Sequence, residues 1–467
     1  MKGNKTVKYV AEVISILLGL FIAIGIKPTE ALSAEALRVL GIFVWGVINL
    51  VIALAPSYVI GLVMAMLWFA TKSVGLGTIF SGFAGSTWWL IVGVMGLGAA
   101  VRNSGLLKRL SLYSLKFFKP TYTGQVLALI VMGLLIASLI PSTTAKCAIM
   151  GSLALGISDE LDLPKKGKGR FGLLMALWLG FNISGNVFIN ASFQGYMVLG
   201  ILPEATQATY TWMTWFLRML PWTLVLFITY YFYIKTSFKE ESSKEISKEY
   251  IDEQFRQLGA VTRNEKITAV VMGICLIMFI LEQKTGIGSV VVSVLGMCAL
   301  TFLGVIGPKE FINNTLWPLV VFIGICLGFG SVFNAVGISS WMVGLLTPLA
   351  SSLSNPYIFV AAICLMTYVV RIVVDQVAVN TVLIAIVYPL AVKIGIDPWI
   401  ACIAVYNSSI VFYPLYVHPN MMISLGAVGG EENIDTKHFL PADIAFMVLN
   451  LVAMLVSVPI WHMLGMC

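Results

Sequence analysis

Long apolar stretches follow one another along almost the whole chain, separated by short polar or basic segments. Most are close to the roughly 20 residues that an α-helix needs to cross a bilayer. Backbone polar groups in lipid must be hydrogen-bonded within the protein, so these stretches are expected to be helices. The first predicted span ends near residue 26, and the others cover approximately 39–55, 57–70, 87–101, 171–202, 212–233, 267–281, 289–305, 316–336, 400–428 and 439–463.

Two polar turns interrupt this pattern, each between apolar runs too short to cross a bilayer comfortably. The first, 141–146, reads Pro-Ser-Thr-Thr-Ala-Lys, and the second, 375–381, reads Asp-Gln-Val-Ala-Val-Asn-Thr. The basic loops 102–119 and 165–170, on both sides of the first pair of runs, place its two ends on one face of the membrane, as in a re-entrant hairpin. The segment 339–356 contains no Lys or Arg and is expected to be a loop outside the cell. The predicted fold is an all-α polytopic membrane protein with about eleven transmembrane helices plus two re-entrant hairpins.

Two of the spans contain clusters of amide, hydroxyl and proline residues in their middle. The span 171–202 is interrupted at 182–186 and again at 190–192. The span 400–428 is interrupted around 407–409 and around Pro414 and 418–420. We expect both to be discontinuous helices.

An internal repeat relates the two halves of the chain. Five residues recur at one fixed offset: Phe83, Thr87, Trp89, Val92 and Gly96 match Phe311, Thr315, Trp317, Val320 and Gly324. The segment 103–105 recurs more loosely at 334–337. Because an odd number of crossings separates matching elements, the copies have opposite topology, as in inverted-repeat transporters. The predicted organisation is an N-terminal helix and loop (1–38), a first repeat with the inner hairpin (39–234), a cytoplasmic linker (235–266) and a second repeat with the outer hairpin (267–467).

Composition agrees with this pattern. Of the 467 residues, 59% are hydrophobic and 11% are charged, against about a quarter charged in soluble domains. The net charge of +7 is explained by basic cytoplasmic loops, and no basic cluster interleaved with aromatic residues indicates nucleic-acid binding. The scattered cysteines and histidines predict neither a disulfide framework nor a zinc site. The loop charges predict an integral protein of the inner or plasma membrane, with its N-terminus in the cytoplasm and its C-terminus outside.

The polar turns carry the candidate chemistry. At each turn a second half-helix begins inside the protein, where its free N–H groups and dipole attract an oxyanion. The N-capping residue types there are Ser142, Thr143, Thr144, Asn380 and Thr381. Two such ends suit a small dianion, whereas carbonyls freed by the helix breaks suit a hard cation such as sodium. The alternative is that these hydroxyl groups only bond neighbouring helical turns.

Ionisable residues near the turns are candidates for function, because charges within the membrane are costly. Lys146 either offers positive charge to an anion or stands where a coupling cation would sit; alternatively it pairs with a carboxylate or snorkels. Arg371 and Asp375 are four residues apart and either act in the site or neutralise each other on one helix face. His418 either titrates in the site or is a satisfied core histidine.

The segments 83–92 and 104–106 and the two hairpins resemble the divalent anion/sodium symporter family, whose human members transport dicarboxylates, citrate or sulfate. That family carries Ser-Asn-Thr at each hairpin tip. Here the tips read Ser142-Thr143-Thr144 and Val379-Asn380-Thr381, and a related element of the tenth span reads His-Pro-Asn at 418–420. The departures are Thr143 in place of Asn, Val379 in place of Ser, and the added charge of Lys146.

The resemblance implies that the tips and the facing breaks bind the substrate and sodium. The implied substrate contacts are Ser142, Thr143, Thr144, Ser184, Asn186, Asn380, Thr381, Pro419 and Asn420. Taken together with the charged residues near the turns, the candidate ion-coupling or charged positions are Ser142, Lys146, Gly185, Asp375 and Val379. The resemblance also implies a homodimer, no cofactor and no metal other than sodium ions at the hairpin tips.

The predicted function is secondary active transport of small di- or tricarboxylate anions by sodium-coupled symport with elevator-type alternating access. A sodium-independent dicarboxylate/citrate exchanger and a sulfate transporter of the same fold are the alternatives. An intramembrane enzyme would need a paired acid/base or metal set, and the sequence contains neither HExxH nor paired aspartates. A channel would not need two occluding hairpins.

Overall fold

Helices make up the architecture of the computed structural model, which describes residues 5–52, 54–140, 142–239, 244–415 and 418–467. Six of its described helical segments are long and apolar enough to cross a membrane, or seven if a bent pair counts as one span. This architecture confirms the all-α polytopic fold class. The number of eleven crossings stays a prediction, because the shorter helices and the broken spans do not qualify by length alone.

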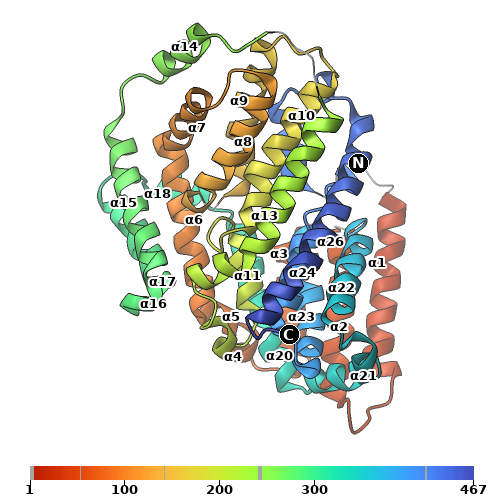
Figure 1. The fold of residues 1–467 in the computed structure, drawn as a ribbon. Coiled ribbons are helices and arrows are strands. Elements are labelled where there is room, and N and C mark those ends of the chain that lie inside the picture. Colours follow the sequence, from red (N-terminus) through yellow and green to blue (C-terminus); the bar gives the residue numbers. More distant parts are fainter. Residues whose placement is uncertain (1–4, 53, 141, 240–243, 416–417) are drawn as a thin grey trace.

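The helices occupy three regions in Figure 1. At one edge α6 (Ser86–Ser104) packs against α17 (Ser289–Phe302), beside α15 (Arg263–Ile280). At the opposite edge α1 (Lys5–Leu20) packs against α2 (Ala34–Ile52). The hairpins and broken spans lie between, together with α13 (Trp212–Ser237) and α26 (Phe439–Met463). The shorter or peripheral elements are η1 (Phe21–Gly25), α3 (Ser57–Ala70), α4 (Leu76–Ile79), α5 (Ser81–Ala84), α12 (Glu204–Gln207), α16 (Glu282–Thr285), α18 (Pro308–Asn314), α19 (Trp317–Leu327), α20 (Phe329–Ala335), η6 (Gly430–Glu432) and η7 (Thr436–His438).

Each hairpin turns at a capped helix N-terminus. The first consists of α8 (Tyr122–Ile136) with η2 (Ala137–Leu139), followed by α9 (Thr143–Glu160). The second consists of α22 (Pro356–Arg371) and α23 (Gln376–Ile394). The Ser142 hydroxyl accepts a hydrogen bond from the Ala145 N–H at 3.2 Å. The Asp375 carboxylate accepts bonds from the first free N–H groups of α23. These side chains satisfy groups that the helix leaves unpaired; Pro141 lies outside the described residues.

The two interrupted spans are broken where the sequence predicts. The first is divided into α10 (Lys168–Leu177), η3 (Trp178–Asn182), η4 (Ile183–Asn186) and α11 (Phe193–Gly200). The second is divided into α24 (Pro398–Ser408) and α25 (Pro419–Ala427). The breaks leave backbone groups without helical partners, so side chains from neighbouring elements are needed there.

Two segments expected to be loops are helices. The basic segment 102–119 contains α7 (Leu106–Phe117), and the segment 339–356 is mostly covered by α21 (Ile338–Leu353). A glycine in the left-handed region precedes each of them, Gly105 at φ 81° and Gly337 at φ 79°, and α6 and α7 meet at 70°. Only glycine adopts this backbone without strain. The bends fall at the loosely matching positions 103–105 and 334–337, which supports the internal repeat.

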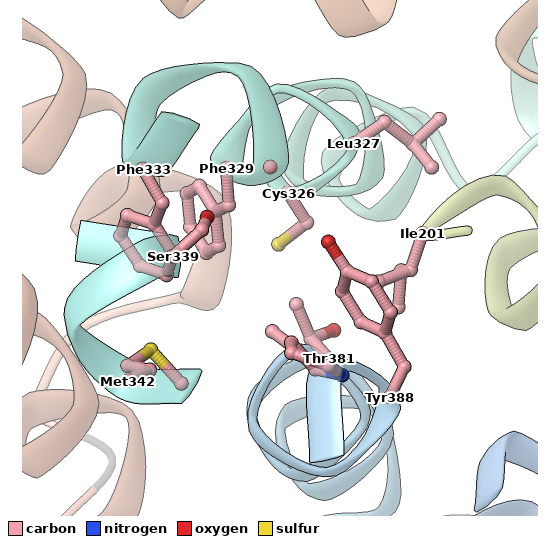
Figure 2. Close-up of a pocket in the computed structure, with 12 residues that line it drawn as sticks. Ile201, Cys326, Leu327, Phe329, Phe333, Ser339, Met342, Thr381 and Tyr388 are labelled. Atoms are coloured by element: carbon pink, nitrogen blue, oxygen red, sulfur yellow. The ribbon is translucent and has the colours of Figure 1, made fainter. Parts of the chain in front are cut away.

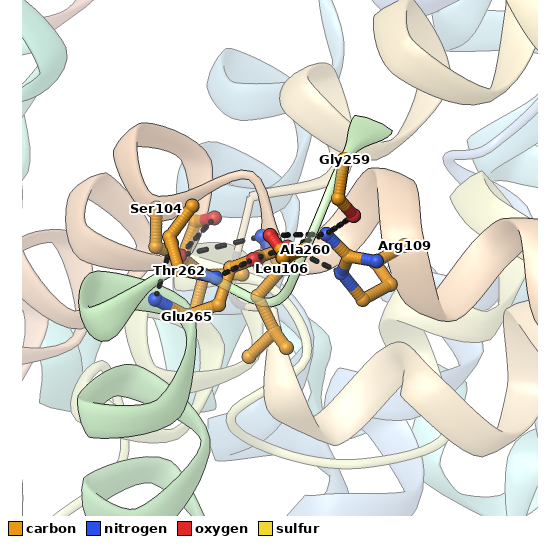
Figure 3. A network of polar contacts seen from close by, with 8 residues as sticks. Ser104, Leu106, Arg109, Gly259, Ala260, Thr262 and Glu265 are labelled. Carbon is orange, nitrogen blue, oxygen red and sulfur yellow. Dashed lines mark hydrogen bonds and ion pairs between the residues drawn. The ribbon is translucent and has the colours of Figure 1, made fainter. Parts of the chain in front are cut away.

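The linker is more ordered than a solvated connector. Within 235–266, α14 (Lys248–Leu258) packs on α7, where Phe255 lies 5.1 Å from Tyr113 between ring centroids. Its entry is held by Ser247, whose hydroxyl donates to Glu160 at 2.6 Å. At its exit Arg109 of α7 forms a buried ion pair with Glu265, with Nε and Oε1 2.7 Å apart (Figure 3). The linker therefore ties α7 and the base of the first hairpin to the second half.

Candidate functional site

Asn420, at the start of α25, joins the tip of the first hairpin to the break in the fifth span. Its Oδ1 accepts a hydrogen bond from the Thr144 hydroxyl at 2.8 Å. Its Nδ2 donates to Thr143 Oγ1 at 3.0 Å and to Asn182 Oδ1 at 2.9 Å. We call these four residues the Asn420 node. Three of them were predicted as substrate contacts, whereas Asn182 was recognised only as part of the break.

The first tip is partly accessible. Ser142, Thr144 and Asn420 are half-buried, and Pro419 is exposed at the first turn of α25. Proline has no N–H and suits that position, where the N–H would be unpaired. The N-termini of α9 and α25 are therefore joined through the Asn420 node at an accessible surface.

The break in the fifth span lies directly beneath this tip. A Cβ on Gly185 would lie 2.7 Å from Thr143 Cγ2, so glycine allows the close approach. On the other side the Asn186 amide donates to Asn407 Oδ1 in the tenth span at 3.0 Å. The Ser184 hydroxyl is buried and has no hydrogen-bond partner in the part of the chain that the structure describes.

The second tip is more deeply buried. Asn380 has no exposed surface, and within the described ranges neither its amide nitrogen nor its amide oxygen has a hydrogen-bond partner. Val379 is also buried, and the Thr381 hydroxyl donates to Val377 O within its own helix at 2.8 Å. Thr381 borders a small cavity, together with Cys326 and Tyr388 (Figure 2).

A larger cavity of about 300 Å³ adjoins the small one and shares several lining residues with it, Tyr388 among them. Its lining includes Thr87 of α6, which donates to Gln207 Oε1 at 3.1 Å, and Asn334 of α20. The second tip is thus approached by cavities lined from both repeats.

A chain of amide groups, which the sequence analysis missed, anchors the second tip. Gln194 of α11 donates to Gln376 Oε1 at 3.1 Å, and Gln376 donates to Ser409 Oγ at 3.2 Å. All three side chains are buried. The available signal was the position of Gln376 directly after the capping Asp375, since amide side chains within apolar stretches usually bond across helices.

Each hairpin gives one buried cation to the carbonyls of a helix break. Lys146 is fully buried and its Nζ donates to Ala191 O at 3.1 Å, so it does not snorkel. Arg371 donates to Ser409 O at 2.7 Å and to Val411 O at 3.0 Å, and also to Val374 O. Cationic side chains thus meet freed carbonyls in both halves.

Arg371 and Asp375 do not share a helix face, and that interpretation is wrong. The helix α22 ends at Arg371, and Asp375 caps the next helix with its carboxylate on backbone N–H groups. The turn between them redirects the chain, so the four-residue spacing is not a helical spacing.

His418 is not a satisfied core histidine. It is 1% exposed, and neither ring nitrogen has a hydrogen-bond partner among the described residues. Its ring lies edge-on to that of Trp178, with 4.7 Å between centroids.

The chain is similar to several characterised or named membrane proteins. Dicarboxylate transporter 2, chloroplastic, of Spinacia oleracea is 25% identical over 349 residues, which cover 72% of this chain and 61% of that protein. The match therefore spans less than two thirds of the spinach protein. The inner membrane protein YbhI of Escherichia coli (strain K12) is 24% identical over 339 residues, 68% of this chain and 69% of that protein.

Solved transporter structures share the fold. The YdaH transporter of Alcanivorax borkumensis, described as having an unusual topology, matches with a TM-score of 0.60 at 13% identity, covering 98% of both chains. MtrF of Neisseria gonorrhoeae, from a class of antimetabolite efflux pumps, matches with a TM-score of 0.58 at 12% identity, covering 98% of this chain and 94% of that one.

The family model described as the sodium:sulfate symporter transmembrane region matches residues 5–467. This match extends over both hairpins, both broken spans and the linker, and it confirms the resemblance seen in the tips. The chain belongs to the sodium:sulfate symporter family and is an integral membrane transporter.

Proposed function

We propose that this transporter carries small dicarboxylates and exchanges them without sodium. The observation that carries the proposal is the contact between the Lys146 ammonium and the Ala191 carbonyl, at the break where a coupling cation would otherwise find free oxygen ligands. The dicarboxylate assignment is supported by the anion-receiving helix ends and by the name of the spinach relative. Of the two coupling modes that the sequence leaves open, exchange is therefore favoured.

Electrostatics supports a sodium-independent mechanism. Two like unit charges about 4 Å apart at an effective dielectric constant near 20 repel by roughly 4 kcal/mol. That repulsion corresponds to about a thousandfold loss of affinity, so a sodium ion beside the protonated form of Lys146 would bind poorly. Arg371 has the same effect at the second break, where it already holds the carbonyls of Ser409 and Val411.

A dianion suits the remaining groups. The N-termini of α9 and α25 meet at the Asn420 node, and each helix end offers roughly half a positive charge. The unpartnered Asn380 amide at the start of α23 supplies donors for a second carboxylate. The proposal includes elevator-type movement of the hairpins and broken spans, a homodimer, and the cell's inner membrane with a cytoplasmic N-terminus, in line with the charged loops and the YbhI relative.

Labelled succinate uptake into proteoliposomes tests the proposal. We expect saturable uptake that is equal in sodium and choline buffers and is accelerated by succinate inside the vesicles. Parallel uptake of citrate and sulfate ranks the substrates. A strict sodium requirement would overturn the exchange mechanism, and selective uptake of sulfate would overturn the dicarboxylate assignment.

Substitution of Lys146 provides the internal test of coupling. Lys146→Ala leaves Ala191 O without its ammonium partner, so exchange falls and added sodium stimulates what remains. The control is Lys165→Ala, because Lys165 is exposed in the loop after the first hairpin. If Lys146→Ala behaves like Lys165→Ala, the ammonium has no role in coupling.

A further inference from the structure

The break in the fifth span and the start of α25 meet a second time, beside the Asn420 node. Trp178 is the first residue of η3, and His418 is the N-cap residue of α25. Their rings are 4.7 Å apart between centroids and 81° apart in orientation. Four residues further along η3, Asn182 contacts Asn420 of the same helix α25, here through a hydrogen bond. The two contacts therefore lie side by side on the same pair of elements.

The polar atoms of the aromatic contact have no partners. Trp178 Nε1 and both ring nitrogens of His418 are buried without a hydrogen bond among the described residues. A buried donor without a partner costs free energy, because its lost hydrogen bonds to water are not replaced. Such groups therefore indicate that a ligand or a water molecule binds them in some state of the protein. The indole nitrogen only donates, and a neutral imidazole also carries one N–H. A ligand that satisfies both rings must therefore offer acceptor atoms.

We propose that Trp178 and His418 bind one carboxylate of the transported anion, as substrate-contacting residues beside the Asn420 node. This inference rests on the proposed dicarboxylate transport and assigns it a further subsite. The N-terminus of α25 favours negative charge at the same place. His418 makes no side-chain cap to its own helix, so its ring remains available for the substrate.

The position relative to the other groups fits a dianion. Asn420 is fully engaged, because its carbonyl oxygen and its amide nitrogen already bond Thr144, Thr143 and Asn182. The nitrogens of His418 and Trp178, on the same two elements, have no hydrogen-bond partner among the described residues. The node thus positions the first tip and the fifth-span break, while the aromatic pair supplies donors to the carboxylate.

A matched pair of tryptophan substitutions tests this subsite. Trp399 is also fully buried, and its indole N–H also lacks a hydrogen-bond partner among the residues that the structure describes. It lies at the end of α24 remote from the break and packs against Tyr210, Trp215 and Trp461. Trp178→Phe and Trp399→Phe therefore remove the same atom and similar volume, but only the first change borders the proposed subsite.

We expect Trp178→Phe to raise the KM for succinate uptake about tenfold or more, with Vmax largely retained, because it removes a hydrogen bond to a charged group. Trp399→Phe should change KM less than about twofold. His418→Asn, which keeps one amide donor, should affect KM less than His418→Leu. Thermal unfolding of each purified variant, with and without succinate, reports whether the fold is retained and whether binding is weakened.

The outcomes separate the two proposals. If wild-type protein takes up no dicarboxylate, the proposed function fails, and this subsite fails with it. If wild-type protein takes up succinate but Trp178→Phe matches Trp399→Phe in KM, and His418→Leu matches wild type, only the subsite is overturned. Equal losses of Vmax and thermal stability in both tryptophan variants would identify a packing role and would also overturn it.

Discussion

Side chains at the first hairpin tip bond to residues that are far away in the sequence. Asn420 and Thr143 are 277 positions apart yet lie 3.0 Å from each other between Nδ2 and Oγ1. Residue types at the first polar turn predicted Thr143 and Thr144 as polar groups of the site, and the family resemblance implied Asn420. Their mutual bonds, and the role of Asn182, could not be predicted, because partner choice depends on how distant helices pack.

Gly185 makes the sharpest residue-scale prediction. Gly185→Ala places a methyl group against Thr143 Cγ2, since the added Cβ would lie only 2.7 Å away. The tip must shift to relieve this clash, and displacements of about 1 Å in a binding site cost roughly a hundredfold in rate. We expect succinate uptake to fall by about ten- to a hundredfold.

The control for this change is Gly273→Ala. Gly273 lies inside α15 with no atom within 4 Å of the added Cβ, so uptake should be unchanged and the helix slightly more stable. Unimpaired uptake by Gly185→Ala would contradict the close packing of the tip on the break.

Helix breaks are the defining elements of the site, and each is held by a side chain from a hairpin. Clusters of Asn, Ser and Pro located both breaks correctly in the sequence. The same reasoning missed α7 and α21. The helix α7 is amphipathic, with Leu107 and Leu112 buried beneath a basic exposed side, so its lysines suggested a loop. In α21 the serines and an internal proline are residue types typical of loops, so the helix was not predicted.

Removal of the Arg371 guanidinium tests how the second break is held. Arg371→Gln leaves carbonyls in the segment after α24 without their donor, and each buried unpaired group costs about 1–3 kcal/mol. The apparent melting temperature in detergent should fall by about 5 °C or more.

Arg256→Gln is the matched control for that measurement. The Arg256 side chain is 74% exposed and pairs with Glu253 of the same helix, with Nη1 and Oε2 3.1 Å apart. Such surface pairs contribute about 0–1 kcal/mol. Equal melting temperatures for the two variants would show that Arg371 does not stabilise the break.

At the scale of the whole molecule, the linker adds contacts between the two repeats to those made by their packed helices. The repeat order, the inverted topology and the linker position were predicted from a fixed sequence offset and from loop charges, which require no knowledge of packing, and they stay predictions. The packing of α14 on α7 could not be predicted from the sequence. It depends on particular partners, such as Phe255 beneath Lys116, whose Nζ lies 4.3 Å from the ring centroid.

The Arg109–Glu265 pair should be the strongest of these connections. Both side chains are at least nine-tenths buried, and removing one partner of a buried pair typically costs about 3–5 kcal/mol. We expect Arg109→Ala to destabilise the protein by that amount, measured by chemical unfolding in detergent, and the double variant with Glu265→Ala to be less destabilised than the sum of the single changes.

Arg38→Ala provides the comparison, because the Arg38 and Glu35 side chains are 33% and 49% exposed and their nitrogen and oxygen are 3.0 Å apart. This variant should lose about 1 kcal/mol or less. A similar loss in Arg38→Ala and Arg109→Ala would mean that the linker contact contributes no more than an ordinary surface pair.

The unequal burial of the two tips has a consequence for the other half of the transport cycle. In this conformation Ser142 and Thr144 are half-buried, whereas Asn380 and Thr381 are buried. If the repeats are interchangeable in form, the opposite-facing conformation follows when each repeat adopts the shape of its twin. Labels introduced at Thr144 and Thr381 should then exchange their accessibility to solvent. The inward-facing and outward-facing states of the transporter would thus be two arrangements of the same pair of repeat shapes.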